Sequence, residues 1–370
     1  MIDWRFFKRA DLVMLGAVLA LVAIGCVMIY SCTRTELAER GLTRWATLQT
    51  QLLWVALGLV ALFLTMSFDY TRLTSLHLPI YIGAMGLLTV VLAMPAVRET
   101  HRWMVFGPLR LQPAEFAQLA VLITVAAAAT ARDETHDFLF LLKKLAWVLL
   151  PVALILKEPD LGTPVVVLVT WGVVMYTCGA RWPHLAGFAL AGVLLFSAAW
   201  FGGFIHQYQK DRLLTFMHPW KDPTGDGYHL IQSLIAIGHG GPFGQGIFQG
   251  TQTRLHFIPD QETDFIFTAI AEELGLVGGL LVLFLFGLVI YRCTVVVLEA
   301  KDAFGRLVAA GVTTILAMHV IVNVGMTMGL GPVKGMPLPF ISYGGSNMLA
   351  TMTAIGLVQN VFMRRHKIAF

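Results

Sequence analysis

Residues 264–291 read DFIFTAIAEELGLVGGLLVLFLFGLVIY, a polar start followed by a mostly apolar run. As one continuous α-helix this stretch would be about 42 Å long at 1.5 Å per residue, whereas the hydrocarbon core of a bilayer is about 30 Å thick. The sequence therefore predicts a membrane-spanning helix whose first turns, with Asp264, stand in the headgroup region. A carboxylate at the entrance of a lipid-embedded helix is costly unless it has a partner or a function.

Similar apolar segments recur along the whole chain. Of the 370 residues, 57% are hydrophobic and 13% are charged, whereas about 25% of residues are charged in a soluble domain. This composition predicts an all-α integral membrane protein, a polytopic bundle of about ten transmembrane helices in a single domain over residues 1–370. The predicted segments are residues 12–30, 50–66, 78–95, 113–131, 145–157, 162–179, 184–201, 265–291, 305–329 and 341–363.

The positions of lysine and arginine predict the orientation of the bundle. With a cytoplasmic N-terminus, the short inner loops hold more than half of the 26 Lys and Arg residues. Both termini are then cytoplasmic, and residues 202–263 form one long extracytoplasmic loop. The first apolar run is too long for a signal peptide, so it is expected to be a retained span. The formal charge of +4 reflects orientation and is no nucleic-acid signature.

The predicted outer segments have patterns of their own. Residues 228–238 (YHLIQSLIAIG) suit a short amphipathic helix on the membrane surface, and the glycine-rich residues 240–250 predict irregular backbone. Residues 335–346 (GMPLPFISYGGS) predict a rigid re-entrant turn, which is tolerated at membrane depth when it is buried in protein. His319 and Asn323, spaced i and i+4, are expected to hydrogen-bond across helices.

Three acidic residues stand at predicted helix entrances on the outer face. Asp264 begins the 264–291 helix, Asp160 fits an N-cap in PDLGT, and Glu115 follows Pro113 in QPAE. Each has a plain structural explanation as a carboxylate that complements a positive helix N-terminus. Together they predict an acidic cleft for a general base or a divalent metal (Mg²⁺ or Mn²⁺), with Asp264 and Asp160 as candidate ligands.

Cationic side chains are expected around this cleft. At headgroup level they suit a phosphate-bearing lipid, although ordinary solvated loop charges explain most of them individually. The candidates are Arg102, Lys157, Lys210, Arg212 and Arg254.

The chain resembles the SEDS family (shape, elongation, division and sporulation) over nearly its whole length. The resemblance is carried by the segments LQPAEF, EPDLGT, GYHLIQSLIAIGHGG, PDQETDFIFTAIAEELGLVG and GMPLPFISYGGS. Within the family, DPTGDGYHLIQS and GTQTRL are most similar to the elongation branch, the RodA-like members.

This resemblance implies a ten-helix peptidoglycan glycosyltransferase of the bacterial cytoplasmic membrane. Such an enzyme polymerises lipid II outside that membrane, makes β-1,4 glycan strands with inversion, releases undecaprenyl diphosphate and controls rod shape. The implied partners are a class B penicillin-binding protein (the transpeptidase), other membrane proteins of the elongation complex and membrane lipid, with no nucleic acid.

The resemblance also implies roles for individual residues. Asp264 matches the family's essential aspartate and is expected to be the general base, while Asp160 and Glu115 match two further acidic positions. Substrate contacts are expected from Arg212, Arg102, Lys157, Lys210 and Thr263. One position departs from the family, because Gln118 stands where the family has a lysine three residues after the glutamate. Lys157 is our hypothesis for a replacement cation.

Two other functions remain compatible with these residues. Asp264, Thr268 and Glu272 would share one face of a continuous helix, and such a polar stripe would suit a lipid II flippase. A non-catalytic scaffold for the transpeptidase would instead tolerate substitution of the three carboxylates.

Overall fold

The computed structural model describes residues 9–95, 102–106, 109–130, 138–158, 160, 162–203, 210, 215–221, 223, 225, 227–332 and 335–365. In this part of the chain, eight helices are long and apolar enough to cross a membrane. They are α2 (Leu12–Glu39), α3 (Ala46–Ser67), α4 (Leu73–Ala93, extended by the 3₁₀ turn η1, Tyr70–Arg72), α5 (Pro113–Thr130), α6 (Phe138–Leu156), α8 (Trp182–Phe201), α12 (Ile266–Glu299) and α13 (Ala303–Thr327).

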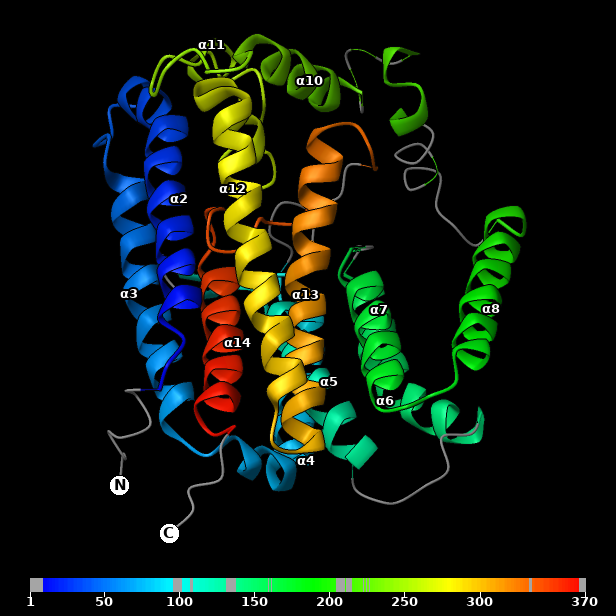
Figure 1. Cartoon of the computed structure of the whole chain (residues 1–370). Helices are drawn as coiled ribbons and strands as arrows, with labels where there is room; N and C mark the ends of the chain where they lie inside the picture. Colours follow the sequence, from blue (N-terminus) through cyan, green and yellow to red (C-terminus); the bar gives the residue numbers. More distant parts are fainter. Residues whose placement is uncertain are drawn as a thin grey trace.

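Two further upright helices complete the bundle. The apolar α7 (Gly162–Thr177) is shorter, and α14 (Gly345–Met363) is less apolar but almost entirely buried. The predicted fold class, an all-α integral membrane bundle of about ten helices, is confirmed (Figure 1).

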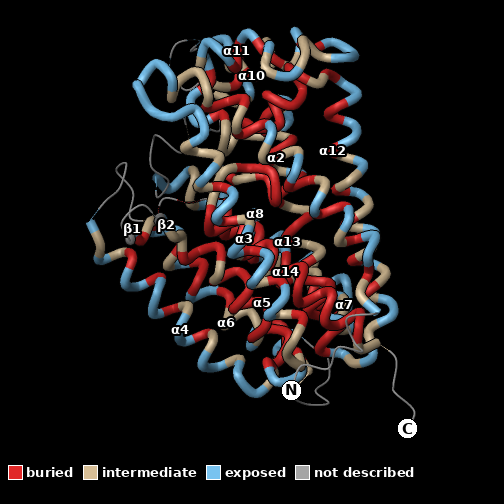
Figure 2. The backbone as a smooth tube through the Cα atoms, turned by 90° about the vertical axis from the view of Figure 1, so that its left-hand side faces the viewer, coloured by how far each residue is buried: buried red, intermediate tan, exposed pale blue. Residues whose placement is uncertain are grey.

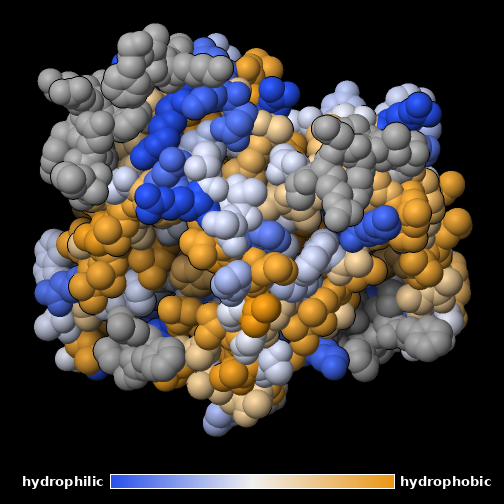
Figure 3. All heavy atoms as spheres, turned by 90° about the horizontal axis from the view of Figure 1, so that it is seen from below, coloured by the Kyte–Doolittle hydropathy of each residue, from blue (hydrophilic) through white to orange (hydrophobic). Residues whose placement is uncertain are grey.

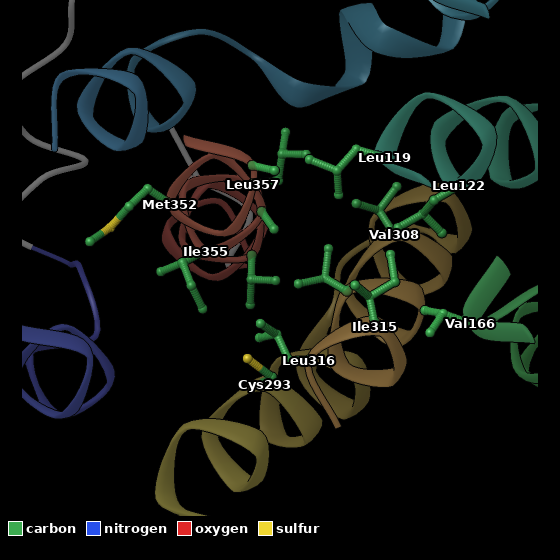
Figure 4. Packing of buried hydrophobic residues seen from close by; sticks show 14 of the residues in the cluster. Leu119, Leu122, Val166, Cys293, Val308, Ile315, Leu316, Met352, Ile355 and Leu357 are labelled. Atoms are coloured by element: carbon green, nitrogen blue, oxygen red, sulfur yellow. The ribbon is translucent and has the colours of Figure 1, made fainter. Parts of the chain in front are cut away.

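The buried side chains form one continuous apolar core inside the bundle (Figure 2). Leu122 of α5, Val166 of α7 and Ile315 of α13 converge in it, beside Ile355 of α14 (Figure 4). Lipid tails are as apolar as these side chains, so the helices associate through close packing and polar contacts rather than through the hydrophobic effect. By contrast, α8 stands apart in Figure 1 and has no buried residue.

The two ends of the described chain lie at the same end of the bundle. Asp11 caps α2, and its backbone exchanges two hydrogen bonds of 2.9 Å with the side chain of Gln359 near the end of α14. Its carboxylate forms an ion pair with Arg292 (2.6 Å). Figure 3 looks onto this end, where a patch of strongly hydrophilic side chains lies among extensive hydrophobic surface.

The opposite end is covered by α10 (Tyr228–Gly240), which lies across the top of the bundle in Figure 1. It buries Leu230, Ile231 and Ala236, and it is the amphipathic surface helix that the sequence predicts. The irregular glycine-rich backbone that follows is also confirmed, since Gly241, Gly244 and Gly246 all have positive φ. The short helix α11 (Thr251–Arg254) comes next.

The helix α12 is not the continuous 42 Å helix expected from residues 264–291. At Gly275 the backbone turns sharply (φ 67°, ψ −163°), and a Cβ built on Gly279 would lie 3.5 Å from the end of the Phe267 ring. In a straight helix, residues twelve apart are separated by about 18 Å. Residues 266–274 therefore form a short arm that folds back against the long arm, residues 276–299.

The contacts of the short arm fix its direction. Thr268 lies 2.6 Å from Ser233 of α10, and Ser233 also donates to the carbonyl of Thr327 at the upper end of α13. Asp264 lies about one turn lower, beside Asn323. Asp264 is thus at the lower end of the short arm and Glu272 near its upper end, which reverses the order expected from a helix descending into the bundle.

A loop completes the hydrogen bonding at this turn. Leu276 and Val277 would donate to residues 272 and 273 in a regular helix, but they donate to the carbonyls of Gly241 (2.9 Å) and Pro242 (3.1 Å). The carbonyls of Glu272 and Glu273 accept instead from the amides of residues 245 and 246, both at 3.0 Å. All four backbone groups are therefore satisfied by the 241–246 loop, as buried backbone groups require.

A small β-hairpin precedes α5 and was not predicted. Strands β1 (Met104–Phe106) and β2 (Leu109–Leu111) pair antiparallel, with Met104 opposite Leu111. The hairpin follows Arg102 and leads directly into α5, where the amide of Gln112 donates to Ser346 Oγ at the start of α14 (2.7 Å).

Candidate active site

Three helix N-termini meet at the lower end of the short arm. The helices α5, α7 and α14 begin well below the top of the molecule in Figure 1. The Gln112–Ser346 bond joins the starts of α5 and α14, and a Cβ built on Gly162 at the start of α7 would lie 2.7 Å from Met336 Sδ. Residues 335–344, the predicted re-entrant turn, therefore pack between these helices; Leu338 and Phe340 are fully buried.

Asp264 is anchored through its backbone while its carboxylate stays available. Asn323 donates to the Asp264 carbonyl (2.9 Å) and to the Met336 carbonyl (2.7 Å), which confirms the expected cross-helix bonding of Asn323. Gly335 approaches the carboxylate so closely that a Cβ there would lie 2.9 Å from Asp264 Oδ2. No residue of the described ranges donates a hydrogen bond to this carboxylate.

The surroundings of Asp264 change its acidity. Burial raises the pKa of Asp264 to about 7, and the neighbouring Asp260 adds to the increase, while the charge of Arg102 opposes it. A carboxylate with a pKa near neutrality is suited to accept a proton at physiological pH.

Asp160 is the N-cap that its motif predicts. Its Oδ1 accepts from the amides of Gly162 (2.8 Å) and Thr163 (3.2 Å), and its Oδ2 accepts from Thr163 Oγ1 (2.8 Å). The carboxylate is buried, and its charge acts on both Asp264 and Glu115. Asp160 therefore both caps α7 and belongs to the acidic cluster. Glu115, in the first turn of α5, is buried as well.

Glu158 is a fourth member of this cluster that sequence reasoning passed over. Its side chain is fully buried, and neither carboxylate oxygen has a hydrogen-bond partner in the described part of the chain. Burial raises the pKa of Glu158 to about 8, with a further increase from Asp160 and an opposing effect of Arg102. The sequence does contain a signal, because Glu158 stands two positions before Asp160. The N-cap pattern, however, singles out Asp160 alone.

The predicted cations are placed unequally. Arg102 is partly buried, its charge acts on Asp264 and Glu158, and its Nε has no hydrogen-bond partner among the described residues. The side chain of Lys157 is exposed, next to the buried Glu158. The Lys210 ammonium lies 5.5 Å from the centre of the Trp200 ring of α8. Arg212 lies outside the described residues.

Thr263 is held through its hydroxyl and its carbonyl. Thr263 Oγ1 donates to the Asp260 carbonyl (3.0 Å), and the Thr263 carbonyl accepts from Ser342 Oγ (2.5 Å). Among the described residues, no three His, Cys, Asp or Glu side chains are arranged to hold a metal ion. Asp264 and Asp160 are the two carboxylates that the sequence predicts as ligands.

Glu272 and Glu273 bind the outer loop and are not part of this cluster. Glu272 accepts from the Gln252 and Thr253 amides (2.7 and 3.1 Å) and from Thr253 Oγ1 (2.7 Å). Glu273 accepts from Ser31 Oγ (2.5 Å) and the Phe248 amide (3.0 Å). These buried carboxylates join the loop to α12 and α2, at the far end of the short arm from Asp264. Glu272 therefore does not extend an acidic path from Asp264 down into the bundle.

Comparison with known proteins gives consistent matches over nearly the full length. The family model described as "Cell cycle protein" (FtsW, RodA, SpoVE) matches residues 11–367. FtsW of Geobacter metallireducens, a probable peptidoglycan glycosyltransferase, is 34% identical over 98% of this chain and 97% of its own. The peptidoglycan glycosyltransferase MrdB of Escherichia coli K12 is 36% identical over 96% of this chain and 94% of its own.

A solved structure agrees with this fold. A chain from a peptidoglycan synthase complex, studied for its coordination of polymerization and crosslinking, superposes with a TM-score of 0.81. It is 32% identical in sequence, and the match covers 97% of this chain and 99% of the other.

Proposed function

Because this chain belongs to the FtsW/RodA/SpoVE family of cell cycle proteins, we propose that it is a peptidoglycan glycosyltransferase, the activity that its relatives FtsW and MrdB are named for. The proposed substrate is lipid II, and the products are a β-1,4-linked glycan strand and undecaprenyl diphosphate. The observation that carries the proposal is the available carboxylate of Asp264, with a pKa of about 7, at a point where three helix N-termini converge.

Asp264 is the proposed general base. It takes the proton from the 4-hydroxyl of the acceptor GlcNAc as that oxygen attacks the anomeric carbon of the lipid-linked MurNAc. The new C–O bond forms as the bond to the α-linked diphosphate breaks, so the configuration inverts and the electron pair leaves with the diphosphate. A positioned base contributes roughly 10²–10⁴-fold to the rate. The Asn323 bond to the Asp264 backbone supports this positioning.

The leaving diphosphate needs positive charge around it. The converging N-termini of α5, α7 and α14 supply partial positive charge, which suits an anion. Arg102 is proposed as the first of these cations, because its charge lowers the pKa of Asp264. Further proposed substrate contacts are Arg212, Lys157, Lys210 and Thr263.

Asp160 and Glu115 are proposed to set the geometry and charge of the site. Asp160 fixes the N-terminus of α7 through its three hydrogen bonds. Asp264 and Asp160 would hold Mg²⁺ or Mn²⁺ together with the substrate's phosphates, as Mg²⁺ commonly binds, and such an ion would neutralise charge on the leaving group.

We place the protein in the elongation branch, as a controller of rod shape, because of its DPTGDGYHLIQS and GTQTRL segments. A class B penicillin-binding protein is the proposed partner, by analogy with the peptidoglycan synthase complex that this chain resembles. The protein is a multi-pass membrane protein; we propose the cytoplasmic membrane, with both termini cytoplasmic and α10 outside.

The fold does not support the alternative function, a lipid II flippase. It depended on an acidic stripe between Asp264 and Glu272, but the Glu272 carboxylate is occupied by three hydrogen bonds from residues 252 and 253.

The deciding experiment is polymerisation of labelled lipid II by the purified protein in detergent, with and without its penicillin-binding partner. Wild type should make glycan strands without a membrane gradient, and Asp264→Asn should make none while keeping its thermal transition. Full activity of Asp264→Asn would refute the proposed base. Absence of strands from wild type, even with partner and divalent metal, would refute the glycosyltransferase.

A further inference from the structure

Three polar side chains line one small cavity in the core of the bundle. Gln118 Nε2, Thr170 Oγ1 and Trp171 Nε1 are all buried and have no hydrogen-bond partner among the described residues. All three residues line the same cavity between α5, α7 and α13. The rest of its wall is apolar, and includes Leu122 and Ile315, which lie near each other in Figure 4.

This coincidence requires an explanation. A buried donor or acceptor without a partner costs about 1–3 kcal/mol, and here three such atoms share one cavity. A buried water typically makes about three hydrogen bonds to polar groups that are otherwise unsatisfied. The cavity has a volume of about 10 Å³, at the lower end of the range that holds a single water molecule.

The chemistry of the lining selects the ligand. The Trp171 indole is a donor only. Gln118 Oε1 lies 3.4 Å from His319 Nε2, which leaves the amide nitrogen, also a donor, for the cavity. Two N–H groups repel a cation, and no cationic side chain lines the cavity to attract an anion. A small neutral acceptor that can also donate to a hydroxyl fits all three groups.

We propose that this cavity binds one water molecule that accepts from Gln118 Nε2 and Trp171 Nε1 and donates to Thr170 Oγ1. The water joins α5 to α7, and the contact between Gln118 and His319 extends the connection to α13. Glu115 lies one turn above Gln118 on α5, and Asp160 caps α7. The water therefore helps to fix the relative position of two acidic residues of the candidate site.

The water site depends on Gln118, which stands where the family has a lysine. A lysine at position 118 would bring its own ammonium into this region, whereas the neutral amide of Gln118 leaves room for water. This cavity therefore needs no side chain from Lys157, which is exposed.

The test is magnetisation transfer from water protons to indole protons, measured by solid-state NMR on the full-length protein in lipid nanodiscs with ¹⁵N-labelled tryptophan. Trp171→Phe identifies the Trp171 signal, and the exposed Trp182 serves as a positive control. Wild type should show transfer to Trp171. The near-isosteric pair Gln118→Met and Thr170→Val, combined in one variant, should lose it, because the cavity keeps its volume but retains one of its three polar groups, too few to hold a water.

Two results would overturn the proposal. One is a wild-type Trp171 indole that receives no transfer from water. The other is equal transfer in the double variant, since this would mean that bulk water, and not a bound molecule, reaches the indole. Neither measurement depends on activity, so the water site and the proposed glycosyltransferase can fail separately, and the wild-type result decides the proposal even if the variant does not fold.

Discussion

The amide of Asn323 lies 2.9 Å from the backbone carbonyl of Asp264, so a helix core residue sets the position of the candidate base. The same amide nitrogen also binds the Met336 carbonyl (2.7 Å). One side chain thus ties α13 to both segments that enclose the carboxylate.

Asn323→Leu should therefore lower both stability and activity. It removes the donor from the buried Met336 carbonyl, at about 1–3 kcal/mol, and from the half-buried Asp264 carbonyl. It also frees Asp264 to shift, which should slow polymerisation by about 10- to 100-fold. Asn360→Leu is a matched control, because Asn360 also donates to two carbonyls, those of Thr65 and Phe68. Thermal unfolding and polymerisation rate would be measured for both, and an equal loss of activity per folded molecule would contradict a positioning role for Asn323.

The pH profile should report the pKa of Asp264. The basic form is the active one, so kcat/KM should rise with pH up to about 7 and fall about tenfold per unit below it. Arg102 lowers this pKa, so Arg102→Gln should move the acidic limb of the profile, the part where kcat/KM rises with pH, to higher pH. Lys157→Gln, at an exposed position, should leave the limb in place. A limb that Arg102→Gln does not move would mean that another group is the base.

Glu158→Gln should be tolerated and should stabilise the protein at alkaline pH. The folded pKa of Glu158 is raised from 4.5 to about 8, so the stability that the protonated group contributes is present at low pH and is lost as pH rises through 8. The glutamine variant does not ionise and should gain Tm relative to wild type between pH 5 and pH 9. Glu36→Gln, at a surface ion pair with Arg40, should show no such trend. A constant Tm difference would mean that Glu158 is already ionised in the fold.

Glu272→Ala should release the outer loop without removing the catalytic group. It deletes the acceptor of three hydrogen bonds from residues 252 and 253, so limited proteolysis should cut residues 241–256 faster and Tm should fall. Activity per folded molecule should fall far less than in Asp264→Asn. A Glu272→Ala protein that is fully stable but inactive would contradict this prediction and support the flippase hypothesis, in which Glu272 lines a translocation path.

Gly275→Ala should prevent correct folding of α12. A Cβ would lie 2.3 Å from the Gly244 amide nitrogen, at a φ of +67°, and the strain and overlap together should cost about 2–5 kcal/mol. Gly287→Ala on the same helix meets nothing within 4 Å and should be neutral or gain about 0.5–1 kcal/mol. Expression level and thermal unfolding of the two variants would be compared, and a Gly275→Ala protein as stable as Gly287→Ala would argue against the turn.

Helix positions were predictable because apolar runs of sufficient length have few alternatives in a membrane. The surface helix at 228–240, the irregular glycine segment and the Asn323 contacts also followed from local pattern. The turn at Gly275 did not, because glycines also occur inside straight transmembrane helices, and the turn depends on backbone contacts with residues 241–246. Glu158 was missed for a related reason, since its burial depends on how α6 and α7 meet.

The four backbone bonds between residues 241–246 and the turn of α12 place a constraint of length on this loop. Because amides and carbonyls make these bonds, side chains such as that of the exposed Phe243 are free to vary. Insertion or deletion of one residue between Pro242 and Gln245 would instead put the bonds of residues 241 and 242 out of register with those of residues 245 and 246. Evolution and protein engineering can therefore change the exposed side chains of this loop, but they must preserve its residue count and its glycines at positive φ.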